Sequence, residues 1–176
     1  MAVTVQDIID SVTADVPGAP FDETVDTIKV GSADAEVTGV VTTFLATDRI
    51  LHFAAEQGLN FVITHEPVFY NHADETEPFA DSPVLQAKLA FARENGITIW
   101  RCHDYAHSLE PDIIFEGVIG ALQWEKYRVD ADDVALFELT HRPRPSALAN
   151  ELKSALSTSR VLLAGAPDAQ CRRVGL

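Results

Sequence analysis

The chain has 176 residues, and its 13 Lys and Arg against 27 Asp and Glu give a formal net charge of −14 at pH 7. Such a charge repels phosphate backbones and anionic lipid surfaces, so we expect neither a nucleic-acid-binding nor a membrane-binding protein. No apolar run reaches membrane-spanning length, and the 2 cysteines cannot build a disulfide framework. The sequence therefore predicts a soluble cytoplasmic protein.

Hydrophobic periodicity predicts helices and strands that alternate along most of the chain. The predicted helices lie within residues 5–15, 47–58, 82–96, 111–122 and 146–156. The predicted strands lie within residues 25–30, 37–45, 61–64, 97–102, 134–139 and 161–163. The first two strands are joined by a short turn and can pair as a hairpin.

The order of strand, helix and strand predicts right-handed crossovers and parallel strands. We expect an α/β fold with a mixed, largely parallel sheet and helices on both faces. We also expect residues 1–176 to form a single domain. The last residues, CRRVGL, resemble the beginning of one more strand, so we interpret the chain as the N-terminal part of a longer protein.

The stretch from Asn60 to Tyr70, NFVITHEPVFY, has the pattern of a buried strand that ends in a functional site. Its apolar run breaks without a turn residue into His65 and Glu66. Parallel strands covered on both faces read as continuous apolar runs, and ligands bind beyond their carboxyl ends. His65 and Glu66 therefore lie where binding or catalysis is expected.

The strand within residues 97–102 repeats this pattern, because His103, Asp104 and His107 follow its apolar run. Groups that leave two neighbouring strands at the same edge can converge on one ion, or on two ions about 3.5–4 Å apart. Imidazole mixed with carboxylate suits Zn, Mn, Fe or Ni better than Ca or Mg. The sequence thus predicts a site for one or two divalent transition-metal ions.

The alternative is that each histidine is a hydrogen-bonded residue that orients a loop at a strand end. We adopt this interpretation for the isolated His52 and His141. For the histidines near the two strand ends we favour metal binding, since both ends carry the same residue types. These histidines are His65, His72, His103 and His107.

Two motifs in this part of the chain resemble those of a known family. THEP, at Thr64–Pro67, resembles the Thr-His-His-Pro signature of the Ngg-one-interacting-factor-three-like proteins, dinuclear-metal proteins often labelled homologues of type 2 GTP cyclohydrolase I. ITIWRCHDYAHSLEPDIIFEGVIGALQW is similar to that family's strand ending in His-Thr-Asn-Leu-Asp and the glycine-containing helix after it. The resemblance covers most of the chain to about Trp124.

Two positions depart from the family pattern. Glu66 stands where the family has a second ligating histidine, and His107 stands where it has a ligating aspartate. The exchange conserves the number and formal charge of the matching ligands. The resemblance therefore implies metal ligands at His65, Glu66, His107 and His103. The family's histidine and glutamate near the C-terminus have no counterpart in this chain, so we expect only part of a two-metal site.

Three functions are consistent with these patterns. The first is a metal-dependent hydrolase-like protein, of cyclohydrolase or phosphoesterase type, in which Glu66 or Asp104 moves a proton of a small-molecule substrate or its attacking water. The second is a non-enzymatic metal-binding scaffold or regulatory protein that acts through protein partners, and the third is a metal-free α/β domain. The resemblance also implies a ring-like homo-oligomer, commonly a hexamer.

Overall fold

The computed structural model describes residues 2–129 and 135–176. The chain divides into two compact units, Met1–Glu110 and Pro111–Leu176. A single domain over residues 1–176 stays a prediction. None of the described helices is long and apolar enough to cross a membrane.

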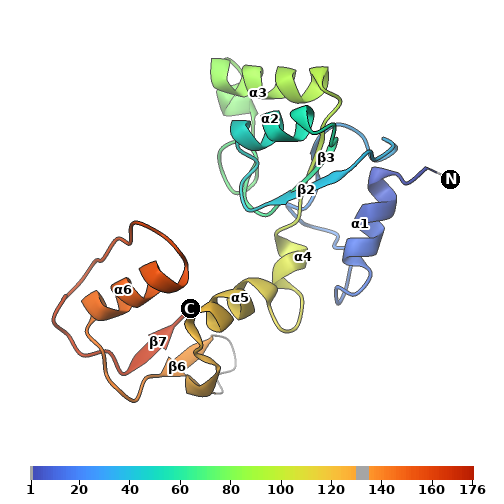
Figure 1. The fold of residues 1–176 in the computed structure, drawn as a ribbon. Coiled ribbons are helices and arrows are strands. Elements are labelled where there is room, and N and C mark those ends of the chain that lie inside the picture. The colour runs from blue at the N-terminus through green and yellow to red at the C-terminus, as the bar shows by residue number, and fades with distance from the viewer. Residues whose placement is uncertain (1, 130–134) are drawn as a thin grey trace. The chain divides into compact units, whose positions relative to one another are not determined.

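The first unit alternates helices and strands (Figure 1). Its helices are α1 (Val5–Thr13), α2 (Asp48–Glu56), α3 (Pro83–Glu94) and α4 (Asp104–His107), with a 3-10 turn at Glu77–Phe79. Its strands are β1 (Ile28–Val30), β2 (Val40–Thr43), β3 (Phe61–Thr64) and β4 (Thr98–Arg101). The short helix α4 lies where the sequence predicted only polar residues after a strand.

Side-chain caps fix the starts of the longer helices, as their sequences predict. Thr4 and Asp7 form a capping box at α1, in which the Asp7 N–H donates to Thr4 Oγ1 and the Thr4 N–H donates to Asp7 Oδ2. The Thr47 hydroxyl oxygen accepts the Ile50 N–H at the start of α2. Ser82 caps α3 in the same way, with proline as the first helical residue.

The four strands form one sheet in the order β1-β4-β3-β2. β2, β3 and β4 are parallel, whereas β1 runs antiparallel to β4. A helix follows each of β2 and β3 in the chain. These helices provide the crossover connections that parallel strands need. The predicted α/β fold with a mixed, largely parallel sheet is confirmed.

Hydrophobic clusters cover both faces of this sheet. On one face, Val62 packs in a cluster with Leu51 of α2 and Ala92 of α3, and Figure 1 shows these two helices side by side. On the other face, Phe61 packs in a cluster with Val5 of α1. Neighbouring residues of a strand point to opposite faces, so Phe61 and Val62 join different clusters. Helices therefore lie on both faces, as predicted.

The predicted hairpin between the first two strands is wrong. β1 and β2 lie at opposite edges of the sheet, and β1 pairs with β4 instead. The segment between them is bound to the start of the chain, since the Val5 N–H donates to the Ala35 carbonyl and the Val37 N–H donates to the Val3 carbonyl. Because of these hydrogen bonds, the connection between β1 and β2 forms no tight turn and runs from one edge of the sheet to the other.

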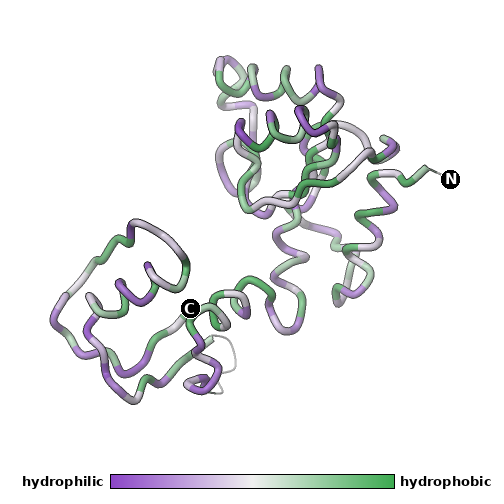
Figure 2. The backbone as a smooth tube through the Cα atoms, viewed as in Figure 1, coloured by the Kyte–Doolittle hydropathy of each residue, from purple (hydrophilic) through white to green (hydrophobic). Residues whose placement is uncertain are grey.

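The second unit contains a three-stranded antiparallel sheet in the order β5-β6-β7. Its strands are β5 (Arg128–Val129), β6 (Leu136–Glu138) and β7 (Arg173–Gly175), and its helices are α5 (Ile113–Leu122) and α6 (Pro145–Ala155), with a 3-10 turn at Glu125–Tyr127. Trp124, Phe137 and Leu148 form its core. Figure 2 shows that α5 is hydrophobic along most of its length.

Two sequence predictions need correction in this unit. The parallel order of the first unit does not continue, because all the pairings of β6 are antiparallel. Residues 161–163 were expected to form a strand but do not, and the side chain of Leu162 is fully exposed. This apolar run pairs with none of the strands of this sheet, whose order is β5-β6-β7. Residue 134 of the predicted strand 134–139 lies outside the described residues.

Gly31 allows the chain to pass close to β4. Its φ is +94°, and a Cβ at this position would lie 2.7 Å from the Cα of Thr98.

We expect Gly31→Ala to lower the free energy of unfolding by about 2–4 kcal/mol, because backbone strain adds to a backbone clash. Gly58→Ala is the matched control. The φ of Gly58 is +68°, and a Cβ there would lie within 4 Å of no described atom beyond its own chain neighbours, so this change should cost about 1 kcal/mol. Urea denaturation measures both, and equal losses would contradict the close approach.

Candidate metal centre

The two strand ends identified in the sequence lie side by side. Thr64, the last residue of β3, is the register partner of Arg101, the last residue of β4. The Cys102 N–H then donates to the Thr64 carbonyl at 2.9 Å, which extends the pairing by one residue. Because the strands are parallel, His65 and His103 leave the sheet at the same edge.

Three imidazoles converge at this edge. The ring centroids of His65 and His103 are 4.7 Å apart, those of His65 and His107 are 5.0 Å apart, and those of His103 and His107 are 4.8 Å apart. One nitrogen from each ring can be chosen so that all three lie within 4.8 Å of one another. The cluster could therefore bind a metal ion, and imidazole nitrogens are suitable ligands for Zn, Mn, Fe or Ni.

The helix α4 brings two of these residues together. His103 is its N-cap residue, and the His107 N–H donates to the His103 carbonyl at 3.1 Å. Residues four apart on a helix lie on the same face. The spacing of His103 and His107 in the sequence is thus the reason that both rings reach His65.

A second group shares one histidine with the first. His72, His103 and Asp104 also offer ligand atoms within 4.8 Å of one another. His72 comes from the loop after β3, so this group again joins residues that follow β3 and β4. The ring centroids of His72 and His103 are 5.1 Å apart, so this loop lies at the same edge of the sheet as His65.

Hydrogen bonds at Nδ1 orient two of the rings. The carbonyl of Cys102 lies 3.3 Å from His65 Nδ1, and Asp104 Oδ1 lies 3.0 Å from His103 Nδ1. When Nδ1 carries a proton for these oxygens, the lone pair of Nε2 is left for an ion, an arrangement typical of metal-binding histidines. The residues present therefore fit a metal ion in their chemistry as well as in their spacing.

The electrostatics favour neutral imidazole and ionised carboxylate. Burial lowers the pKa of His65, helped by the nearby His103 and His107 and opposed by the bond to Cys102. Burial opposes ionisation of Asp104, but hydrogen bonds from His103, Thr24 and Val25 outweigh it and lower the pKa of this carboxyl. Metal ligands bind in these deprotonated forms.

Asp26 supports the cluster from the beginning of β1, and the sequence analysis missed it. Its carboxylate is buried, with Oδ1 accepting the His103 N–H at 2.7 Å and Oδ2 accepting the Tyr105 N–H at 2.8 Å. It thus satisfies two unpaired N–H groups at the start of α4, in the manner of a helix cap. No local pattern signals this role, because Asp26 lies more than seventy positions before α4.

Arg101 was also missed, although a basic residue at the end of a buried strand is a recognisable signal. Its side chain is fully buried. Its guanidinium donates from Nε to the His65 carbonyl at 3.2 Å and from Nη1 to the His72 carbonyl, and it pairs with Asp74. Arg101 therefore ties the backbone of His65 to the loop that carries His72.

The structure does not bring Glu66 into either group of potential ligands. Its backbone N–H donates to the Phe44 carbonyl at 2.9 Å, and its side chain is half-buried. The carboxylate still acts on the site at a distance, since it raises the pKa of His65 slightly against the larger effect of burial. Its predicted roles as ligand and proton carrier stay predictions.

The remaining candidates lie outside the site. His52 stacks on Phe91 with ring centroids 4.0 Å apart, and neither His52 nor His141 belongs to a described group of ligands. Burial raises the pKa of the Cys102 thiol to about 12, which removes any nucleophilic role near neutral pH.

Comparison with solved structures gives 10 significant matches. The hypothetical protein SA1388 of Staphylococcus aureus matches with a TM-score of 0.74 and 15% identity, over 99% of this chain and 71% of that one. A Bacillus cereus protein related to NIF3 gives 0.72 and 11%, over 99% and 76% of the two chains. Reduced HcgD from Methanocaldococcus jannaschii gives 0.58 and 18%, over 88% and 60%. At these identities the likeness shows a shared fold.

Comparison with curated protein sequences gives no match. The model of one protein family, Duf34/NIF3 (NGG1p interacting factor 3), matches residues 3–176. This match covers nearly the whole chain, and it agrees with the fold and with the two histidine motifs at the ends of β3 and β4. The chain therefore belongs to the Duf34/NIF3 family.

Proposed function

We propose that this protein is a metal-dependent, hydrolase-like protein. The observation that carries the proposal is the convergence of His65, His103 and His107, with two of the rings oriented through Nδ1. These residues would hold a divalent Zn, Mn, Fe or Ni ion. A bound metal would lower the pKa of a water molecule and supply a nucleophile near neutral pH.

The carboxylates of Asp104 and Glu66 have different roles in this proposal. Asp104 holds its hydrogen bonds to His103, Thr24 and Val25 through both oxygens, so it acts as a positioning residue for the His103 ring. Glu66 is half-buried and outside both ligand groups, which leaves it as the proton carrier. The substrate proposed is a small molecule with a hydrolysable phosphoester or cyclic amidine. We further propose that the chain forms a homo-oligomer, a hexamer by its resemblance to the family.

A second candidate is a metal-stabilised scaffold that acts through protein partners. The hydrogen bonds of Asp104 favour this candidate. Its carboxylate lies beside the imidazoles but is held by three hydrogen bonds, and a carboxylate held in this way fixes the geometry of the site rather than transferring protons. The name of the family, NGG1p interacting factor 3, also describes an interaction rather than a reaction.

Metal content tests the centre itself. In protein purified without chelator, we expect about one or more transition-metal ions per chain by elemental analysis. His65→Ala and His107→Ala should each lose most of this metal, since each removes one imidazole of the group. His52→Ala is the matched control, because His52 stacks on Phe91 outside the group, and it should keep its metal.

Metal-free protein that does not respond to added Zn, Mn or Fe would overturn both candidates. Metal retained in both variants would place the ion elsewhere. Turnover of phosphoester or cyclic amidine probes that disappears with the metal supports the hydrolase. Metal that raises the melting temperature with no turnover supports the scaffold.

A further inference from the structure

A cavity of about 710 Å³ opens beside α3 in the first unit. It lies between the loop that follows β3 and the start of α3, and most of its lining is apolar. The apolar side chains include Val68, Phe69, Tyr70, Phe79, Val84 and Leu85. None of the proposed metal ligands lines it, so it is a separate feature of the same unit. Its volume suits a small organic molecule.

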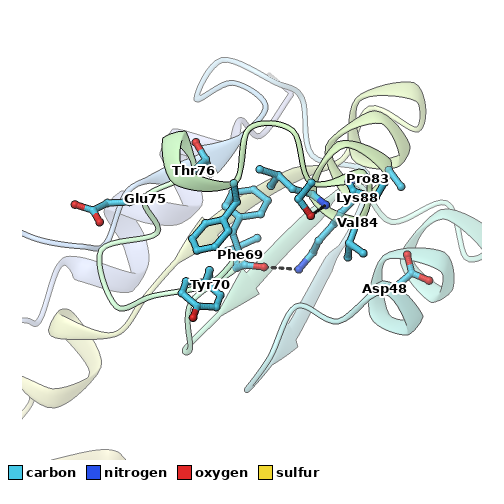
Figure 3. A pocket seen from close by; sticks show the side chains of 13 residues that line it. Asp48, Phe69, Tyr70, Glu75, Thr76, Pro83, Val84 and Lys88 are labelled. Atoms are coloured by element: carbon cyan, nitrogen blue, oxygen red, sulfur yellow. Dashed lines mark hydrogen bonds between the residues drawn. The ribbon is translucent and has the colours of Figure 1, made fainter.

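Lys88 is the one basic residue among the described residues that line this cavity. Its Nζ donates to the Val68 carbonyl and lies 5.7 Å from the centroid of the Phe69 ring. Figure 3 shows its side chain extending from α3 beside Phe69, with the dashed line marking this hydrogen bond. The ammonium group is therefore placed against the aromatic wall of the cavity.

Neighbouring acids balance the charge of Lys88 only in part. None of the ion pairs among the described residues includes Lys88. Burial lowers the pKa of Lys88, and the attraction of Asp74 and Asp48 only partly offsets this effect. A half-buried cation without an ion-pair partner carries a desolvation cost, and an anion that enters the cavity would reduce that cost.

We propose that this cavity binds a small monocarboxylate with an aromatic or branched apolar body, and that the carboxylate pairs with Lys88. The apolar body would be removed from water against Phe69 and Phe79, which supplies most of the affinity. The carboxylate would accept a charge-assisted hydrogen bond from Nζ, which supplies the selectivity.

The acids in the lining limit the ligand to a single negative charge. Asp48 and Glu75 both line the cavity, and both are exposed. Figure 3 shows the carboxylate of Glu75 directed away from the aromatic rings. A second anionic group on the ligand would lie nearer these acids and be repelled. Nucleotides and other multiply charged phosphates are therefore poor candidates.

Calorimetric titration with 3-phenylpropionate tests this site, with 3-phenylpropan-1-ol as the uncharged probe. The full chain is first stripped of metal by a chelator and dialysed, so that coordination of the carboxylate by an ion cannot mimic the result. We expect the acid to bind the wild type at least about tenfold more tightly than the alcohol. Lys88→Met should abolish this difference, whereas Lys126→Met, which removes an exposed lysine that is not among the lining residues, should keep it.

Two variants that place a charge at the mouth of the cavity test the same proposal if Lys88→Met fails to fold. Val84 is 77% exposed, so a charge there does not disturb the core. Val84→Asp should weaken binding of the acid, and Val84→Lys should strengthen it, while the alcohol is unaffected. Absence of binding by the wild type, equal affinity for acid and alcohol, or equal affinity of the two Val84 variants would each overturn the proposal.

Discussion

Replacement of Arg101 by methionine should lower the free energy of unfolding by about 3–5 kcal/mol, one of the largest effects expected from a single change in this chain. The guanidinium is fully buried and pairs with Asp74 Oδ2 at 3.6 Å. Without it, Lys29, also at 3.6 Å, is the ion-pair partner that the buried carboxylate of Asp74 keeps among the described residues. The His65 and His72 carbonyls would lose their donor as well. Urea denaturation with a two-state fit measures the loss.

Two companion variants separate charge from geometry. Arg101→Lys keeps the positive charge but replaces the planar fork with a single ammonium group, which cannot reproduce the separate bonds from Nε and Nη1, so it should recover only part of the loss. Combining Arg101→Met with Asp74→Asn should cost less than the sum of the two, because the second change removes the charge that the first leaves unpaired. A loss below about 1 kcal/mol for Arg101→Met would contradict the role given to this side chain.

Replacement of Asp26 by alanine should weaken both the fold and the metal centre. The change leaves the buried N–H groups of His103 and Tyr105 without acceptors, so we expect a loss of about 2–4 kcal/mol in the free energy of unfolding. It also frees the start of α4, which positions His103 and His107. We therefore expect metal affinity to fall by about tenfold to a hundredfold, as found when groups that support metal ligands are removed.

Asp34→Ala is the matched control for Asp26→Ala, because Asp34 is an exposed acid and its loss changes the net charge equally. It should leave stability and metal affinity nearly unchanged. Asp26→Asn should fall between the two, since one amide oxygen remains to accept but the NH₂ group faces a donor. Unchanged metal affinity in Asp26→Ala would show that α4 is held in place without this carboxylate.

The parts of the fold that rest on local patterns could be predicted from the sequence. The continuous apolar run Phe61–Thr64 predicted a buried strand, and the structure has β3 at the same residues. The caps Thr4, Thr47 and Ser82 belong to patterns of this kind, because capping depends on residues only three positions away. The positions of His65, His103 and His107 followed from the same logic, since polar residues directly after parallel strands share an edge.

The parts that rest on distant contacts could not be predicted in this way. Pairing of β1 with β4 depends on residues about seventy positions apart, and local pattern favoured the nearer β2. Asp26 reaches His103 only because of that pairing. The apolar run at residues 161–163 has the composition of a strand, but whether a strand forms depends on a free sheet edge beside it. Glu66 follows His65 directly, yet adjacency in the chain did not bring its carboxylate into the ligand groups.

The hydrogen bonds described above that orient His65 and His103 come from residues of the first unit. The donors and acceptors involved belong to β1 and its approach, to the ends of β3 and β4, and to α4. Substitutions that accumulate in the second unit over evolution therefore leave these hydrogen-bonding groups in place. Divergence of homologous chains should accordingly be slow around Asp26, Arg101 and the three imidazoles, and faster beyond residue 110.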